Sequence, residues 1–266
     1  MNNPQLPEAF QSVLSLGVLQ GYFPVKNLNR WGSLIAMGIC LCGAIAACLY
    51  AVYEAYLWSP YGFVMIQDRM TTPLAISGVL LLVAGLAGWG AYASWIKGIA
   101  LYEAGLACRS RKGIQAWRWE DVDRFYTAIT RHYINGIYTG TTHVYILFNR
   151  SEKRLVLNDA YAHVVDLGKK VEQGTFPRLY EHAVSRYNTG EALDFGPVIL
   201  SQAGIQVRKK VYPWSEVQQV SIRRGILQVL KKDGGRFSGM HVAASAIPNV
   251  RVLLSLVDQI VGIKTA

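Results

Sequence analysis

Residues 31–53 read WGSLIAMGICLCGAIAACLYAVY, a run of 23 residues without a charged side chain. A second uncharged run, MTTPLAISGVLLLVAGLAGWGAYASWI, covers the 27 residues from 70 to 96. Each run is long enough to cross a membrane as a helix, because a helix rises about 1.5 Å per residue and the hydrocarbon core is about 30 Å thick. We therefore predict two membrane spans, at about 31–53 and 72–96, rather than two buried helices of a soluble core.

The two runs also indicate how the spans pack. Small residues recur at four-residue spacing, Gly43 with Ala47 and Ala84 with Gly88, and such faces let helices approach closely. They serve either contacts between copies of the chain or, as we prefer, the packing of the two spans on each other. Neither run contains an acid, a base or a histidine, which argues against transport of ions or protons by this hairpin alone.

Charged residues around the spans predict their orientation. The connecting segment, 54–69, carries two acids and one base. Basic residues concentrate on the cytoplasmic side of membrane proteins, so we expect a cell (inner) membrane protein with its N-terminus and its C-terminal globular part in the cytoplasm. The first run starts too late for a signal peptide. The basic residues outside the pair of spans are Lys26, Arg30, Lys97, Arg109, Arg111 and Lys112.

An internal repeat organises the rest of the chain. The first matching pair shares the pattern Leu-x-(Glu/Gln)-Ala-Gly-(Leu/Ile)-x-x-Arg. Because three matches occur in the same order with small changes in spacing, we interpret them as a diverged duplication. The matches are Leu101–Arg109 with Leu200–Arg208, Trp119–Val122 with Trp214–Val217, and Val171–Gln173 with Val257–Gln259.

In each copy the sequence predicts several strands followed by one helix. Hairpin turns are predicted, for example, at Phe148–Glu152 and at Lys232–Gly235. This order is the outline of a pleckstrin-homology-like (PH-like) barrel, which a helix closes at one end. The predicted fold class is thus membrane-anchored α+β, with a transmembrane helical hairpin and two PH-like strand-rich barrels, each closed by a C-terminal helix. The predicted domains are an N-terminal cytoplasmic segment (1–30), the hairpin (31–97), the first repeat with a linker helix at 178–186 (98–190), and the second repeat (191–266).

Several stretches together resemble a family of mainly bacterial membrane proteins that is known only as a domain of unknown function. The most specific is RHYINGIYTGTTH, residues 131–143; the others include Tyr102–Leu106, Phe195–Pro197 and Ile247–Val250. The resemblance covers most of the chain. It implies two N-terminal membrane helices followed by PH-like repeats, and it implies no activity and no catalytic residue.

The sequence predicts neither catalysis nor a cofactor. It contains no HExxH, P-loop or GxSxG motif, and we expect a protein that is not an enzyme. His132 and His143 flank the turn region from Asn135 to Gly140, and they would face each other across a hairpin if that loop held four residues. No nearby cysteine or acid completes a metal site with them.

Two sets of residues are candidates for binding. The first is basic: the chain has a net charge of +10, and 204–240 carries eight basic and two acidic residues. These residues either contact the anionic membrane surface or form an ordinary solvated face. The basic candidates are Arg109, Arg111, Lys112, Arg208, Lys209, Lys210, Arg223, Arg224, Lys231 and Lys232.

The second set is the loop containing Tyr133, Asn135 and Tyr138, which is either a recognition loop or a hairpin turn that needs glycine. Trp119 and Trp214 hold equivalent repeat positions, and we expect both to pack in the core.

These observations favour a non-catalytic, membrane-anchored module. Its tandem PH-like domains are expected to engage anionic lipid head groups, a protein partner, or both. The alternative is a structural subunit of a membrane complex that assembles through the transmembrane hairpin. An enzyme is a weaker third hypothesis, and nucleic acid is a weak candidate ligand because no recognition motif accompanies the basic residues.

Overall fold

The computed structural model describes Phe10, residues 15–232 and residues 241–261. Its chain divides into two compact units. One holds Pro24–Ile99 and Cys108–Gln115, and the other holds the remaining described residues. The predicted turn residues after Lys232 lie outside the described part.

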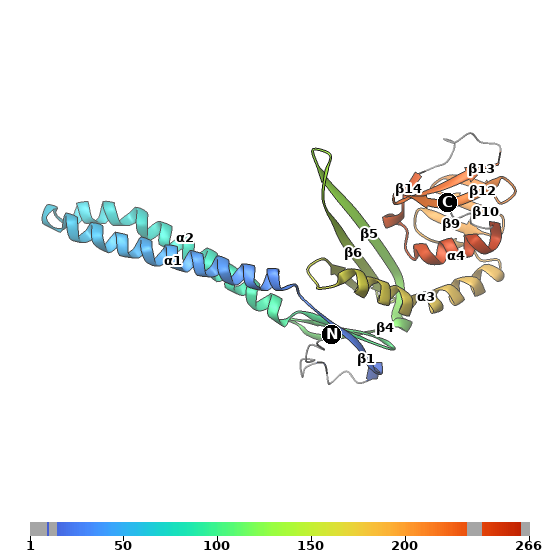
Figure 1. Cartoon of the computed structure of the whole chain (residues 1–266), viewed down its shortest axis with the longest axis horizontal. Helices are drawn as coiled ribbons and strands as arrows, with labels where there is room; N and C mark the ends of the chain where they lie inside the picture. The colour runs from blue at the N-terminus through green and yellow to red at the C-terminus, as the bar shows by residue number, and fades with distance from the viewer. Residues whose placement is uncertain (1–9, 11–14, 233–240, 262–266) are drawn as a thin grey trace. The chain divides into compact units, whose positions relative to one another are not determined.

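Two long helices form the first unit, α1 (Asn27–Trp58) and α2 (Phe63–Ile96), and they lie side by side (Figure 1). A short 3-10 turn (Ser59–Tyr61) and Gly62, with φ of +99°, reverse the chain between them. Both helices are long and apolar enough to cross a membrane. The predicted connecting segment, 54–69, is mostly helical, because charge ends an apolar run without ending a helix.

Small residues lie where the two helices touch. A Cβ atom on Gly43 would be 3.2 Å from the Leu80 side chain, and one on Gly88 would be 3.0 Å from the sulfur of Met37. The hydroxyl of Ser77 is buried and donates to the carbonyl oxygen of Ala44 at 3.2 Å. The small residues thus serve packing within the hairpin.

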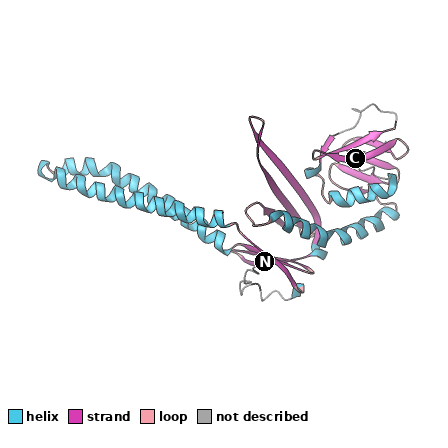
Figure 2. Cartoon of the chain, in the orientation of Figure 1, coloured by secondary structure: helices cyan, strands magenta, loops and turns pink. Residues whose placement is uncertain are grey.

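The chain up to Asn158 also contains two sheets, whose strands are coloured magenta in Figure 2. Strand β1 of the first sheet precedes the two helices, and the other strands follow them. The first sheet has the order β1-β2-β3-β4 and the second β5-β6-β7. The long helix α3 (Val164–Asn188) comes next. The strands are β1 (Leu19–Pro24), β2 (Gly98–Tyr102), β3 (Gly105–Ser110), β4 (Gly113–Arg118), β5 (Val122–Ile134), β6 (Ile137–Asn149) and β7 (Arg154–Asn158).

The C-terminal part also contains a four-stranded sheet, a three-stranded sheet and a helix, in this order. Its first sheet has the order β11-β10-β9-β8, its second β12-β13-β14, and helix α4 (Val250–Val261) follows. Buried aliphatic residues of both sheets and of α4 form one core. The strands are β8 (Leu193–Asp194), β9 (Val198–Ser201), β10 (Gly204–Val207), β11 (Lys210–Pro213), β12 (Val217–Arg223), β13 (Ile226–Lys231) and β14 (His241–Ala243).

The two tryptophans occupy comparable corners. The amide of Trp119 donates to the carbonyl of Ala104 at 3.0 Å, and the amide of Trp214 donates to that of Ala203 at 3.4 Å. The Trp119 side chain is buried, whereas that of Trp214 is partly buried against the core. Each tryptophan therefore fixes the turn between two sheets.

Three expectations need correction. No sheet in the described residues closes into a barrel, because a turn rather than a hydrogen-bonded ladder joins the sheets at each tryptophan. The predicted closing helix and the linker helix at 178–186 are one helix, α3, which contains Pro177. Strand β1 lies within the N-terminal segment, for which no strand was predicted. Helix α3 ends at Asn188, and Gly190 follows it with φ of +85°.

Candidate functional site

The predicted basic turn between β3 and β4 is attached to helix α2. The guanidinium of Arg111 lies 4.4 Å from the centroid of the Trp89 ring. Its Nη2 also donates to the carbonyl oxygen of Trp89 at 3.2 Å. Lys112 beside it is exposed, so the turn presents charge close to the C-terminal end of α2.

Similar arginine–tryptophan contacts occur at both ends of the helical hairpin. Arg30 lies 5.5 Å from the ring of Trp95, at the same end of α2 as Trp89. At the other end, Arg69 lies 5.1 Å from the ring of Trp58. Arg69 and Trp89 are 20 residues apart on α2, which corresponds to about 30 Å along a helix. The two ends are thus separated by about the thickness of a hydrocarbon core.

The other basic candidates lie on turns of the C-terminal sheets. Arg208, with φ of +56°, Lys209 and Lys210 make the turn from β10 to β11. Arg223 ends β12, and Arg224, with φ of +52°, begins the following turn. Both turns leave their basic side chains exposed.

Lys231 and Lys232 are separated from this group. Lys231 pairs with Val217 at the start of β12, whereas Arg223 lies at its end. The seven residues of β12 span roughly 20 Å. The Lys231 amine also donates to Glu216 at 2.7 Å, so it is already neutralised. The basic candidates Arg223 and Lys231 of the C-terminal sheets therefore lie at opposite ends of β12.

The predicted recognition loop is the tip of a long hairpin (Figure 1). Asn135 (φ +50°) and Gly136 (φ +81°) form its two-residue turn, as expected of a type I′ turn. The rings of Tyr133 and Tyr138 meet edge to face at 5.9 Å. Strand β7 pairs with β6 only as far as Val144, so beyond this residue β5 and β6 form a two-stranded ribbon.

Two isoleucines at this tip were missed by the sequence analysis. Ile134 is 65% exposed and Ile137 is 71% exposed, and the two tyrosines beside them are 57% and 56% exposed. The signal that could have found them is their position on either side of Asn-Gly, the commonest hairpin turn. Four large, partly apolar side chains are thus gathered at one exposed point.

His132 and His143 do not face each other. The register places His132 opposite Gly140 and His143 opposite Ile129, because the turn holds two residues and not four. His132 Nε2 bonds the hydroxyl of Thr142 at 2.7 Å. No group of three His, Cys, Asp or Glu side chains in the described residues is placed to hold a metal ion.

The base of the hairpin is packed rather than exposed. Tyr145 stacks on Phe125 with 6.0 Å between ring centroids, and it fills the space that Gly168 of α3 leaves open. Burial raises the pKa of Tyr145, and the nearby carboxylate of Glu172 adds to this effect. The base of the hairpin is therefore packed against α3.

The sequence of the chain matches one protein family along most of its length. The family described as "Family of unknown function (DUF6585)" covers residues 13–264. The chain belongs to this family. No curated protein matches the chain. Membership of DUF6585 agrees with the resemblance to an uncharacterised family and assigns no activity to any residue.

This DUF6585 chain also has a polar groove of about 570 Å³ beside α3. Glu120 and Arg178 form an ion pair across part of it at 3.5 Å. Its titratable side chains are exposed, whereas acid–base catalysis usually relies on groups that burial has perturbed. These side chains are Glu120, Asp123, Arg150, Arg178, Glu181 and His182.

Proposed function

We propose that this DUF6585 chain is a non-catalytic binding module anchored in the membrane by α1 and α2. Its basic β3–β4 turn contacts anionic head groups at the cytoplasmic interface. The observation that carries the proposal is the stacking of Arg111 on Trp89, because it fixes a predicted head-group contact directly on an apolar helix.

The spacing along α2 supports the anchoring. Tryptophan and arginine side chains favour the interface between hydrocarbon and water. Their contacts at Arg69 and at Trp89 are about 30 Å apart along the helix. A buried helix of a soluble protein has no reason to carry such contacts at this separation, and both helices are largely exposed between them.

We further infer that the two strand-rich segments are diverged copies of one PH-like unit. His163 and Asn249 precede α3 and α4 with φ of +53° and +50°. Each accepts, through its carbonyl oxygen, a bond from the amide four residues later. Together with the matched tryptophan corners, this agreement favours a duplication whose copies differ in loop and strand length.

The contact with anionic lipid is tested on the full chain in lipid nanodiscs. Lys112→Cys is labelled with an environment-sensitive fluorophore, after the native cysteines are replaced. We expect a larger blue shift in discs with anionic lipid than in neutral discs. The difference should shrink as salt rises, because the Debye length is only about 8 Å at physiological ionic strength.

Arg111→Ala in the labelled chain should reduce the blue shift, since it removes both the charge and the stacking on Trp89. Arg154→Ala is the matched control, because Arg154 is an exposed arginine of β7 and its loss changes the net charge equally. Equal blue shifts in neutral and anionic discs at low salt would refute the lipid contact.

A protein partner bound at the hairpin tip is the second candidate function. The exposed isoleucines and tyrosines favour it, because aromatic and aliphatic anchors dominate protein interfaces. A photo-crosslinking amino acid at Ile137 should give one discrete protein adduct in cells, and Ile134→Ser should weaken it. Crosslinking to lipid alone would count against a protein partner and would assign the tip to the membrane.

A further inference from the structure

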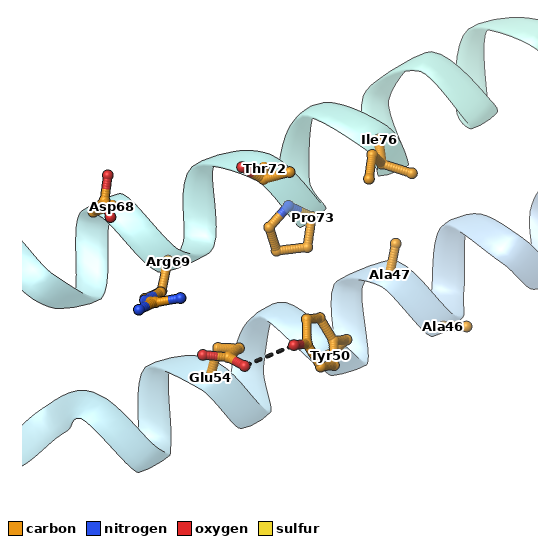
Figure 3. Close-up of a pocket in the computed structure, with 9 residues that line it drawn as sticks. All are labelled: Ala46, Ala47, Tyr50, Glu54, Asp68, Arg69, Thr72, Pro73 and Ile76. Atoms are coloured by element: carbon orange, nitrogen blue, oxygen red, sulfur yellow. Dashed lines mark hydrogen bonds between the residues drawn. The ribbon is translucent and has the colours of Figure 1, made fainter.

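A groove opens between α1 and α2 near the connection of the two helices (Figure 3). Its volume is about 600 Å³, which lies within the usual range of small-molecule sites. Apolar side chains line one end, and charged side chains line the other. The lining residues include Ala47, Glu54, Asp68, Arg69, Pro73 and Ile76.

Trp58 positions the opposite charges of this groove. Its Nε1 donates to one carboxylate oxygen of Glu54 at 2.9 Å, and Tyr50 donates to the other at 2.7 Å. The guanidinium of Arg69 lies 5.1 Å from the Trp58 ring and points toward α1 (Figure 3). Among the described residues, Arg69 forms no ion pair with Glu54 or with Asp68. The groove thus holds an acid and a base that do not form an ion pair with each other.

Pro73 interrupts the backbone hydrogen bonding of α2 beside the groove, which it lines. Proline has no amide hydrogen, so it cannot donate to the carbonyl of Arg69 four residues earlier in the helix. The acceptor that a ligand with N–H donors would meet in the groove is the Glu54 carboxylate.

We propose that the groove binds the head group of a phospholipid that carries both a phosphate and a primary ammonium, namely phosphoethanolamine. Arg69 donates to the phosphate, and Glu54 accepts from the ammonium. Asp68 adds negative charge at the rim. Ala47 and Ile76 contact the first part of an acyl chain.

The proposal rests on the proposed membrane anchoring, because it requires the groove to lie at head-group level. Glu54 directly follows the uncharged run that ends at Tyr53, which is consistent with that depth. The chemistry of the site then discriminates between head groups. Choline offers no N–H donor to Glu54, and glycerol offers no cation.

The experiment uses the full chain in mild detergent. Phosphatidylethanolamine, phosphatidylcholine and phosphatidylglycerol with identical acyl chains are added in equal amounts, and native mass spectrometry measures the lipid retained. We expect phosphatidylethanolamine to be retained about tenfold better than phosphatidylcholine, since a charge-assisted hydrogen bond distinguishes them. Stepwise N-methylation of the head group should lower retention stepwise in the unmodified protein.

Glu54→Gln and Arg69→Gln should each reduce phosphatidylethanolamine retention by about tenfold, at unchanged helix content by circular dichroism. Arg118→Gln is the matched control, because Arg118 is an exposed arginine at the end of β4. Equal retention of phosphatidylethanolamine and its trimethylated form would overturn the proposal. Retention that both groove variants leave unchanged would overturn it as well.

Failure of the groove and failure of the anchoring are distinguishable. Membranes carrying the chain are first extracted with alkaline carbonate. A chain released by this treatment would refute the anchoring, and with it the site. A chain that stays in the membrane but shows no preference for the primary ammonium would refute the head-group site alone.

Discussion

Replacing Gly105 by alanine should destabilise the strand-rich unit, although glycine is normally a poor strand residue. A Cβ atom at this position would lie 2.1 Å from the carbonyl oxygen of Trp117. Gly204 of β10 has similar surroundings, with the carbonyl oxygen of Tyr212 2.2 Å from the position of a Cβ atom. In both cases the obstacle is backbone of the neighbouring strand, so a change of rotamer cannot relieve it.

The expected loss follows from these distances. An ordinary contact needs about 3.5 Å, so the strands must separate by roughly 1 Å or more. Overpacking of this kind costs about 1–3 kcal/mol, and it outweighs the roughly 0.5–1 kcal/mol that alanine normally gains over glycine in a strand. The net loss is then about 1 kcal/mol, which lowers Tm by about 2–4 °C for a domain of this size.

Thermal unfolding of the full chain in detergent, followed by tryptophan fluorescence, measures the effect of Gly105→Ala and of Gly204→Ala. Gly78→Ala is the control, because nothing lies within 4 Å of a Cβ atom at that position of α2, and we expect no loss of Tm there. A Gly105→Ala chain that unfolds at the Tm of the unmodified protein would refute this reasoning.

Three other predictions concern the tryptophan corners, the start of α4 and the topology. Trp119→Phe and Trp214→Phe each remove one side-chain N–H bond to a backbone carbonyl and should each cost about 1 kcal/mol. An unchanged Tm in either variant would contradict the role of that bond. Asn249→Ala removes two bonds to β5, each of 2.9 Å, and should cost about 2–3 kcal/mol in urea unfolding. A reporter inserted at Ser59 should be external and one fused to the C-terminus cytoplasmic, and the reverse result would exclude the predicted orientation.

The apolar runs predicted the existence of α1 and α2 but not their ends. Charge marks where a chain leaves an apolar solvent, whereas a helix ends where the backbone can no longer continue. The residues from Glu54 to Trp58 are compatible with a helix, and only Pro60 and Gly62 break the pattern. The groove near Arg69 could not be foreseen, because it depends on how two helical faces lie against each other.

The continuity of α3 was missed for a related reason. The predicted closing helix and the predicted linker helix are joined through Gly174 and Pro177, two residue types that disfavour a helix interior. The ring of Trp119 packs on α3 at Gly174, where a Cβ atom would lie 2.7 Å from the ring. A glycine is needed at position 174 because Trp119, which is far away in the sequence, packs there. No local sequence pattern indicates this contact.

The residue types predicted where the tip of the β5–β6 hairpin lies. Its exposure could be recognised only from the strand pairing, because β7 does not reach the tip. If the two segments are copies of one unit, then β12 and β13 correspond to β5 and β6. The former contain seven and six residues, and the latter contain thirteen each. Because the shorter hairpin suffices to build the C-terminal sheet, the extra length of β5 and β6 is not needed for folding. A solvent-exposed two-stranded ribbon is at best marginally stable, and this supports the proposal that the isoleucines at its tip bind a partner.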